Sequence, residues 1–344
     1  MPQPSARALS LLQNDWRYGN CCSAVNLATA GIIRSMSKRI AVVGSSNVDL
    51  IMKMDRLPKV GESVSDAEFM QTFGGKGANQ AYAAALAGGD VTFVSCVGDD
   101  SYGAQMIENM RGCGANVEHI YTEPGVATGT ALIMIGEAGQ NYISVAPGAN
   151  YKLTPQHVSQ AGAAIDAADM LVLQYEVPVS TVTAAAERAS ALGKPVMLNL
   201  APPRPIADAL LRLLTYFVVN ETEAAFACGI EVNSDDNVRR AADALRAKGA
   251  ANVIITLGEQ GAFVAGAHGS TYAPSFKVTA IDSTAAGDTF CGAFALALLV
   301  GKSPMDAARF ANAAAAITVT RIGAQISIPT RDEIDAFMRD RAHP

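Results

Sequence analysis

Short runs of apolar, often β-branched residues alternate with longer alanine-rich stretches along most of the chain. The apolar runs predict strands buried on both faces of a sheet, at residues 39–44, 91–98, 170–175, 195–200, 216–220 and 252–258. Helical spacing of the apolar residues predicts helices at 77–88, 101–111, 179–192, 222–228 and 235–248. This alternation indicates an α/β fold, with a doubly wound, mainly parallel sheet flanked by helices.

Two segments, residues 50–73 and 116–150, interrupt this alternation. Both contain strand-like runs separated by glycine and proline turns, and neither has a helical pattern. We expect them to pair into a small separate β-sheet. Because both are inserted near the carboxyl ends of predicted strands, where α/β enzymes bind their ligands, such a sheet would form a lid over the site.

The first 35 residues differ from the rest of the chain. They contain the only tryptophan, Trp16, and the adjacent Cys21 and Cys22. A dispensable extension and a targeting peptide are the two interpretations. The lack of an apolar segment that ends in a small-residue cleavage site favours the extension. We therefore expect a disordered extension at residues 1–36 and one folded domain at 37–342.

Composition narrows the class of function. The 344 residues carry a net charge of −6, which offers no basic surface for nucleic acid or an anionic membrane. No apolar run reaches the ~18 residues of a membrane-spanning helix. The six cysteines show no CxxC spacing and lie mostly among small or apolar residues, which is typical of reduced cysteines in the cytoplasm. A cytoplasmic protein that acts on small molecules is the interpretation these features favour.

A glycine-rich loop precedes the first predicted helix, in "FGGKGANQA" at residues 73–81. A structural turn needs one glycine, whereas Gly74, Gly75 and Gly77 together allow close approach of the backbone to a ligand. Lys76 supplies a mobile cation, and Asn79 can donate and accept hydrogen bonds from the first helical turn. The loop therefore predicts a ligand-binding site.

Polar side chains follow several predicted strands. Asn47 and Asp49 come just after the first strand, and Glu176 follows the strand at 170–175. Each can reach a cleft at the strand ends or cap a local turn, and position alone does not separate the two. In "NETE", residues 220–223, Glu223 is either half of a helix-capping pair or a group that holds metal-bound water near phosphates.

The stretch "STAAGDTFCGAF", residues 283–294, places Asp288 and several small residues directly before an apolar helical run. One interpretation is an N-terminal cap, since an aspartate accepts hydrogen bonds from the first N–H groups of a helix. The other is an anion site, because small residues leave those N–H groups bare and the helix dipole favours negative charge there.

Five motifs in collinear order resemble the ribokinase-like (PfkB) carbohydrate kinases: "GGKGANQA", "NETE", "TLG", "DSTAAGDTFCGAF" and "ANAAAAITVTRIGAQISIPT". The resemblance covers residues 38 to 342. It implies an ATP-dependent kinase with a central α/β domain and a β-sheet lid that often mediates dimerisation. The reaction it implies is phosphorylation of a primary hydroxyl, with D-ribose at its 5-hydroxyl as the leading substrate. A kinase for 2-deoxyribose, another sugar or a nucleoside is the alternative on the same fold, and a protein that only binds such ligands is a third.

The resemblance also assigns roles to residues. It implies that Asp288 is the base that deprotonates the attacking hydroxyl, and that the backbone N–H groups of Ala285, Ala286, Gly287 and Asp288 form the anion hole for the transferred phosphoryl group. The residues it places around the sugar are Asn47, Asp49, Gly75, Lys76, Asn79 and Glu176. The residues it places at the nucleotide are Asn220, Thr256, Gly258 and Asn312.

Two metal ions follow from the same resemblance. Mg²⁺ would accompany ATP, held through water by Glu223. K⁺ would bind beside the anion hole, mostly through backbone carbonyls, at Asp282, Thr284, Thr318, Arg321, Gly323 and Ser327. The side chain of Arg321 would then have to point away from the cation. The expected partners are a small-molecule sugar, ATP and a second copy of the chain bound through the lid.

Overall fold

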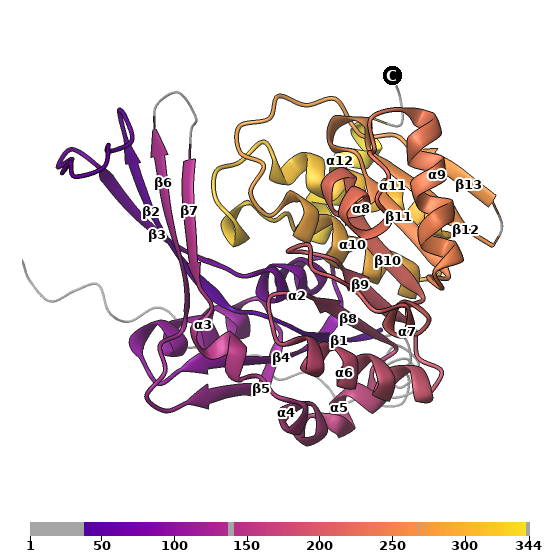
Figure 1. Ribbon diagram of the computed structural model, residues 1–344, viewed down its shortest axis with the longest axis horizontal. Helices are drawn as coiled ribbons and strands as arrows, with labels where there is room; N and C mark the ends of the chain where they lie inside the picture. Colours follow the sequence, from indigo (N-terminus) through magenta and orange to yellow (C-terminus); the bar gives the residue numbers. More distant parts are fainter. Residues whose placement is uncertain (1–37, 137–140, 268, 342–344) are drawn as a thin grey trace, which may run out of the picture. The chain divides into compact units, whose positions relative to one another are not determined.

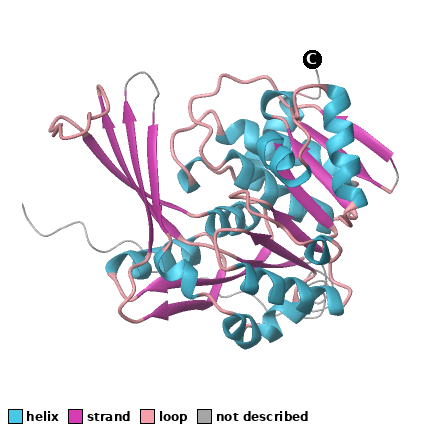
Figure 2. Ribbon diagram, viewed as in Figure 1, coloured by secondary structure: helices cyan, strands magenta, loops and turns pink. Residues whose placement is uncertain are grey.

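The computed structural model describes residues 38–136, 141–267 and 269–341. Within these residues, the largest element is a nine-stranded sheet in the order β13-β12-β11-β10-β9-β8-β1-β4-β5 (Figures 1 and 2). The strands from β11 to β5 in this order are parallel, and β12 and β13 continue the sheet antiparallel. The strands are β1 (Arg39–Val43), β4 (Asp90–Gly98), β5 (Asn116–Glu123), β8 (Met170–Gln174), β9 (Val196–Asn199), β10 (Tyr216–Asn220), β11 (Asn252–Thr256), β12 (Ala262–Gly266) and β13 (Gly269–Ala273).

Helices cover both faces of this sheet (Figure 2). The buried side chains of one set join the apolar core on the first face; this set is α2 (Lys76–Leu86), α3 (Ser101–Gly112), α10 (Ala286–Leu299), α11 (Pro304–Thr318) and α12 (Arg331–Asp340). The other set packs on the second face; it is α4 (Pro155–Gln160), α5 (Gly162–Ala167), α6 (Val179–Ala191), α7 (Asp208–Leu211), α8 (Glu221–Cys228) and α9 (Asp235–Ala247).

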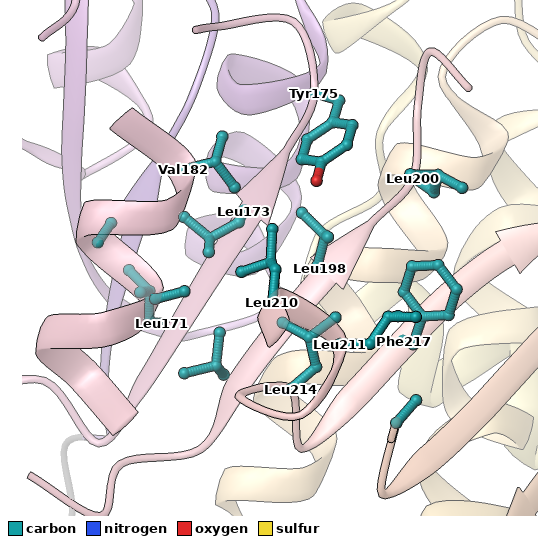
Figure 3. Close-up of a cluster of buried hydrophobic side chains, with 14 of the residues drawn as sticks. Leu171, Leu173, Tyr175, Val182, Leu198, Leu200, Leu210, Leu211, Leu214 and Phe217 are labelled. Carbon is teal, nitrogen blue, oxygen red and sulfur yellow. The ribbon is translucent and has the colours of Figure 1, made fainter. Parts of the chain in front are cut away.

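The two cores explain why the strands read as continuous apolar runs. In β1, Ile40 and Val42 join the core on the first face, and Ala41 and Val43 join the core on the second. Successive side chains of a strand point to opposite faces, so a strand covered on both sides is apolar at every position. Figure 3 shows part of the second core, in which leucines of the strands, of α7 and of the segment after it form one cluster with Tyr175, Val182 and Phe217.

A second sheet of four strands has the order β3-β2-β6-β7. Its strands are β2 (Asn47–Met54), β3 (Glu68–Gly74), β6 (Gly129–Gly136) and β7 (Asn141–Ala146). β2 pairs antiparallel with β3 and parallel with β6, and β6 pairs antiparallel with β7. We call these four strands the small sheet. They come from the two segments that the sequence predicts as a lid.

One part of that prediction is wrong. The segment 116–150 does not belong to the small sheet as a whole, because its first strand, β5, pairs with β4 at the edge of the large sheet. The physical reason is that α3 connects β4 to β5. In such a strand–helix–strand unit, the second strand lies parallel to the first in the same sheet. The segment also ends in a short 3₁₀ helix, η1 (Gly148–Lys152), where no helical turn was expected.

The expected strands and helices otherwise match the structure to within two residues at each end. The expected extension at residues 1–36, with Cys21 and Cys22, lies outside the described residues. Cys96, Cys113, Cys228 and Cys291 are free thiols. Among the helices of the described part, none is long and apolar enough to cross a membrane.

Candidate active site

A pocket lies at the carboxyl ends of the central strands. Asn199, Asn220 and Thr256 end the neighbouring strands β9, β10 and β11, and all three line it. The first turns of α2 and α10 supply its other polar wall. This is the edge of an α/β sheet where ligands bind, because the strand ends and helix starts leave backbone and side-chain groups free there. Its lining consists of Lys76, Asn199, Ala201, Val218, Asn220, Glu223, Thr256, Ser283, Ala285, Ala286, Gly287, Asp288 and Cys291.

The start of α10 forms one wall of the pocket. Ala285, the residue before the helix, has the left-handed conformation with φ 61°. A Cβ at Gly287 would meet no atom within 4 Å, so this position faces open space. The N–H of Ala286 donates to the carbonyl of Ser283 at 3.2 Å. Among the described residues, the N–H groups of Gly287 and Asp288 have no acceptor, as expected for the first turn of a helix.

Asp288 does not cap its own helix. It is the third residue of α10, and no side chain caps this helix. Its buried carboxylate instead accepts two side-chain hydrogen bonds from α2: Asn79 Nδ2 donates to Oδ2 at 3.0 Å, and Gln80 Nε2 donates to Oδ1 at 3.0 Å. The capping interpretation of the sequence is therefore excluded by geometry. The carboxylate is held in one orientation at the edge of the pocket.

Lys76, the first residue of α2, also lines the pocket. The nearby carboxylate of Asp288 raises the pKa of Lys76, against the opposing effect of burial, and Glu176 and Glu223 add to the rise. The ammonium group is therefore charged at neutral pH. It places a positive charge near the carboxylates of the pocket. A bound anion such as a phosphate could pair with this ammonium group in place of some of those carboxylates.

Glu176 fixes the glycine-rich loop. Its Oε2 accepts hydrogen bonds from Ser45 Oγ at 2.6 Å and from the N–H of Lys76 at 2.9 Å. Gly75 has φ 89°, a left-handed conformation that favours glycine, and a Cβ there would lie 2.7 Å from the backbone nitrogen of Asn47. Gly77 packs equally closely, with a Cβ at 2.4 Å from the nitrogen of Ser45. The glycines thus bring the start of α2 against the loop after β1.

Asp49 lies on the small sheet, opposite Thr72 of β3 and Ala131 of β6. Its carboxylate is buried but forms no hydrogen bond within the part of the chain that the structure describes. Burial raises the pKa of Asp49 to about 7, and the negative charges of Glu176 and Asp288 add to the rise. A Cβ at Gly74 would lie 2.2 Å from Asp49 Oδ2, so the carboxylate fills the space that this glycine leaves.

Asn47 is engaged in the structure by a residue that the sequence did not single out. Asn150 Nδ2 donates to Asn47 Oδ1 at 2.7 Å and to the carbonyl of Ser46 at 3.1 Å. Asn150 Oδ1 accepts from the N–H of Ser46 at 2.8 Å. The buried Asn150 therefore fixes the backbone at the base of β2 and leaves the amide nitrogen of Asn47 for other contacts.

Asn220 and Glu223 form the capping pair that the sequence allowed. The N–H of Glu223 donates to Asn220 Oδ1 and the N–H of Asn220 donates to Glu223 Oε2, both at 2.8 Å. This reciprocal cap opens α8. Glu223 also lines the pocket, and burial raises its pKa, with only partial compensation from the Asn220 bond and Lys76. Glu223 can cap the helix and also hold a metal-bound water molecule, because the cap uses Oε2 and leaves Oε1 available.

The residues expected at the nucleotide divide into two groups. Asn220 and Thr256 line the pocket, whereas Gly258 and Asn312 do not. Gly258 opens the 3₁₀ helix η2 (Gly258–Gln260) with φ 54°. Asn312 Nδ2 donates to the backbone carbonyls of Ala273 and Pro274 at 2.8 and 3.2 Å. Asn312 therefore holds the chain after β13, and its assigned nucleotide contact stays a prediction.

The two loops expected to bind K⁺ lie together. The N–H groups of Ile281 and Asp282 donate to the carbonyl of Val319, and the N–H of Gly323 donates to Asp282 Oδ2 at 2.9 Å. Burial alone would raise the pKa of Asp282, but hydrogen bonds from Thr284 and Gly323 outweigh it and lower the pKa. The carboxylate is therefore charged and held between the loops.

The remaining residues of that set take up local positions. Thr318 Oγ1 lies 3.1 Å from Thr289 Oγ1, and Ser327, in η3 (Gln325–Ser327), donates its hydroxyl to the carbonyl of Ala324. The guanidinium of Arg321 pairs with Glu333 of α12 at 2.6 Å and also lies 3.5 Å from the carbonyl of Ser327. Its charge is thus balanced by a carboxylate outside the two loops.

The donor set offers no complete metal cage. Within the described residues, no three His, Cys, Asp or Glu side chains gather closely enough to hold a metal ion. Mg²⁺ commonly binds one or two carboxylates together with water and substrate phosphates. Glu223 and Asp288 in one pocket fit that mode, in which the nucleotide supplies the remaining ligands.

The model of the pfkB family of carbohydrate kinases matches residues 37–331. The chain belongs to the pfkB family. It is 43% identical over 303 residues to the ribokinase of Haemophilus influenzae, which covers 88% of this chain and 99% of that protein. It is 35% identical over 300 residues to the deoxyribokinase of Salmonella typhi, covering 87% and 98% of the two chains.

A solved pfkB-type structure shares the fold. The ribokinase of Arabidopsis thaliana, determined with ribose and ATP, has a TM-score of 0.84 and 32% identity over 88% of this chain and 99% of that one. The family and the fold predicted from the sequence are confirmed. As a pfkB kinase, the chain uses ATP to phosphorylate a carbohydrate.

The site contains residues that the sequence motifs did not single out. The buried Asn199 lines the pocket, and the buried Gln80 lies behind the carboxylate of Asp288. Ser45 and Asn150 fix the loop after β1. Gln80 stands inside the quoted glycine-loop motif, so its position was available. Its contact with Asp288 was not, because the two residues are 208 positions apart in the sequence.

Proposed function

We propose that this chain transfers the γ-phosphoryl group of ATP to the 5-hydroxyl of D-ribose, which gives D-ribose 5-phosphate and ADP. One observation carries the proposal. Asp288 lines a pocket at the start of α10, and two amides fix its carboxylate. Beside it lie the N–H groups of Gly287 and Asp288, which have no acceptor within the described chain. A base and a set of anion-binding donors therefore meet at one point, as phosphoryl transfer requires.

In the reaction, Asp288 takes the proton of the 5-hydroxyl as the hydroxyl oxygen attacks the γ-phosphorus. The bond from that phosphorus to the bridging oxygen breaks, and ADP leaves with the electron pair. The N–H groups of Gly287 and Asp288 bind the charge on the transferred group, and the open space at Gly287 admits it. Ala285 and Ala286 complete the turn that aims these groups. Lys76 supplies a positive charge on the facing wall.

The sugar lies between the small sheet and α2. Asp49, Asn47 and Asn79 supply carboxylate and amide groups for its ring hydroxyls, with Gly75 and Glu176 shaping the loop beside it. The buried Oδ1 of Asn79 accepts no hydrogen bond within the described chain, while its Nδ2 is used by Asp288. This oxygen supports the proposal, because a sugar hydroxyl could donate a hydrogen bond to it after a small shift of the small sheet.

The nucleotide occupies the strand-end side of the pocket. Asn220 and Thr256 line that side, with Gly258 and Asn312 further along the same edge. Mg²⁺, held through water by Glu223 and by the phosphates, supplies charge neutralisation when bound. K⁺ binds to carbonyls of the loops that Asp282 ties together. It would steady the turn that starts α10.

We further propose a cytoplasmic homodimer formed through the small sheet. Large apolar side chains are exposed on both faces of this sheet: Ile143 and Val145 on the face of Asp49, and Phe69, Leu132 and Tyr142 on the opposite face. Exposed apolar groups that gather on one sheet favour association with a second copy. Sedimentation of the purified protein at micromolar concentration tests this, with a monomer as the contrary result.

The test of the reaction is an ADP-release assay with Mg²⁺ and K⁺ over ribose, 2-deoxyribose, other sugars and nucleosides. We expect ribose to give the highest kcat/KM and ribose 5-phosphate as the product. The similarity to a deoxyribokinase makes 2-deoxyribose the specific alternative. A panel in which 2-deoxyribose or a nucleoside reacts best would overturn the ribose assignment. Replacing K⁺ by a bulky organic cation at equal ionic strength should lower the rate, and equal rates would remove K⁺ from the proposal.

A further inference from the structure

Gln80 connects Asp288 to a chain of buried amides. Gln80 Nε2 donates to Asp288 Oδ1 at 3.0 Å and to Asn199 Oδ1 at 3.1 Å. Gln80 Oε1 accepts from Gln174 Nε2 at 2.8 Å. Asn199 Nδ2 in turn donates to the carbonyl of Val218 at 3.1 Å. The network thus runs from Asp288 to the ends of β8 and β9 and to the middle of β10. Gln80 and Gln174 have no exposed surface.

The ionised carboxylate determines which way each amide faces. An ionised carboxylate only accepts hydrogen bonds, so Gln80 must present its nitrogen to Asp288. Its oxygen then faces Gln174, which must present nitrogen to it. Asn199 must accept from Gln80, and it does so while its own nitrogen is used by Val218. Each hydrogen-bonded pair agrees in donor and acceptor, and the buried Oε1 of Gln174 has no partner among the described residues.

Close packing of α2 on α10 makes this contact possible. Gly292 lies one helical turn after Asp288 on the same side of α10. A Cβ at Gly292 would be 2.5 Å from the carbonyl oxygen of Gln80 and 2.7 Å from the Cβ of Ala83. The absence of a side chain at Gly292 lets the two helices approach until the amide of Gln80 reaches the carboxylate. The distance is therefore set by backbone packing rather than by a mobile loop.

We propose that Gln80 is a positioning residue for phosphoryl transfer: it anchors the Asp288 carboxylate to the strand ends through Gln174 and Asn199, so that the carboxylate faces the reacting hydroxyl. Asn79 holds the other oxygen and faces the sugar side. Gln80 lies behind the carboxylate, away from the lining of the pocket. The inference rests on the proposed role of Asp288 as base. It adds that the orientation of this base is supplied by a buried residue that touches no substrate.

The test is the variant Gln80→Met, which keeps side-chain length but removes the donor. We expect kcat to fall by about 10- to 100-fold, since a misplaced catalytic group costs rate on this scale. The KM for ribose and its dissociation constant from calorimetry should stay within about threefold, because Gln80 has no place in the sugar contacts. The control is Gln160→Met on the exposed end of α4, which should change neither value. An equal loss of binding and kcat would overturn the proposal.

A double-mutant cycle with Asp288→Asn separates positioning from general structural damage. If Gln80 acts through the base, Gln80→Met should change kcat by less than about twofold in the Asp288→Asn background, because coupled residues are not additive. A loss that persists in full in that background would overturn the inference, whereas full activity of Asp288→Asn alone would overturn the base assignment instead. If Gln80→Met does not fold, combining it with Gln174→Met removes both amides and leaves no unpaired partner between them.

Discussion

The two aspartates of the site differ in how the protein holds them. Asp288, at the start of α10, accepts two amide hydrogen bonds and is backed by a buried network that reaches three strands. Asp49, on the small sheet, is equally buried but has no hydrogen bond from the described chain, and its pKa is raised to about 7. One carboxylate is fully oriented before any ligand binds. The other has no donor from the described chain, and we infer that a ligand supplies one.

The difference reflects where the two regions obtain their rigidity. The start of α10 is fixed by the large sheet and by close packing against α2, and the polar groups there can be satisfied within the protein. The small sheet has one face toward the site and apolar side chains exposed on both faces. We infer that residues on the large-sheet side mainly determine kcat, and that residues of the small sheet mainly determine which sugar binds. Each of the following variants tests one half of that division.

The largest expected effect is on the oriented aspartate. Asp288→Asn should lower kcat by roughly 10² to 10⁴, the usual contribution of a general base. Ribose should still bind, because the proposed sugar contacts lie mainly on the small sheet and α2. Steady-state kinetics together with calorimetric binding measure the two separately. A kcat near that of the unmodified protein would show that the held carboxylate is not the base.

The second effect concerns stability against pH. Burial raises the pKa of Asp49 to about 7 in the folded protein, well above the ordinary value of 3.8 for an aspartate. The unfolded chain therefore loses this proton at lower pH, so the stability contribution of Asp49 is complete below about pH 4 and is lost as pH rises to about 7. Asp49→Asn removes that loss. Relative to the unmodified protein, the free energy of unfolding of the variant should therefore increase across this pH window by on the order of 2 to 4 kcal/mol.

Urea denaturation of both proteins at pH 5 and pH 8 measures the change in the free energy of unfolding. Asp282→Asn is the matched control, because the pKa of Asp282 is lowered in the folded protein and its substitution should not give a gain at high pH. If the difference in the free energy of unfolding between Asp49→Asn and the unmodified protein is the same at both pH values, the raised pKa of Asp49 is contradicted.

A third effect tests recognition. A buried carboxylate left without its hydrogen-bond partner costs about 1 to 3 kcal/mol. A sugar without the 2-hydroxyl should therefore have a kcat/KM at least about tenfold below that of ribose. Asp49→Ala should impair ribose turnover and narrow the ratio between the two sugars. If the ratio stays as wide in the variant, discrimination lies elsewhere in the site.

The smallest expected effect lies in the turn before α10. Ala285 has φ 61°, a conformation that costs a non-glycine residue roughly 1 kcal/mol. Ala285→Gly relieves that strain but also raises the conformational entropy of the unfolded chain. Because the two effects oppose each other, the melting temperature should shift by only a few degrees. The rate should fall modestly, because the donors that follow are less rigidly aimed. A melting temperature lowered by more than about 8 °C would mean that the alanine side chain has a packing role.

Most of the fold was predictable because its signal is local. The strands buried on both faces, such as β1 and β8, read as unbroken apolar runs, and helices such as α6 and α9 have clear apolar spacing. The assignment of β5 was not predictable from its own residues. Its positions alternate between exposed and partly buried, with Ile120 as its one buried residue, and its connection through α3 places it at the edge of the large sheet.

The site was predictable as a set of motifs but not as a set of contacts. The turn at 285–288 and the glycine loop are adjacent residues, so their spacing is visible in the sequence. The bonds from Gln80 to Asp288 and from Asn150 to Asn47 join residues 208 and 103 positions apart, and no local pattern marks them. The capping pair of Asn220 and Glu223 was seen as one of two options because its members are three residues apart.

Two glycines of α10 would respond in opposite ways to sequence variation. At Gly292 an added Cβ would meet the backbone of α2 at 2.5 Å, so almost any replacement there is selected against by folding itself. At Gly287 the same atom would meet nothing within 4 Å. The fold therefore leaves room for a Cβ at Gly287. We infer that glycine at this position serves the proposed phosphoryl transfer. A library randomised at both positions would thus separate the residues the fold requires from those the reaction requires.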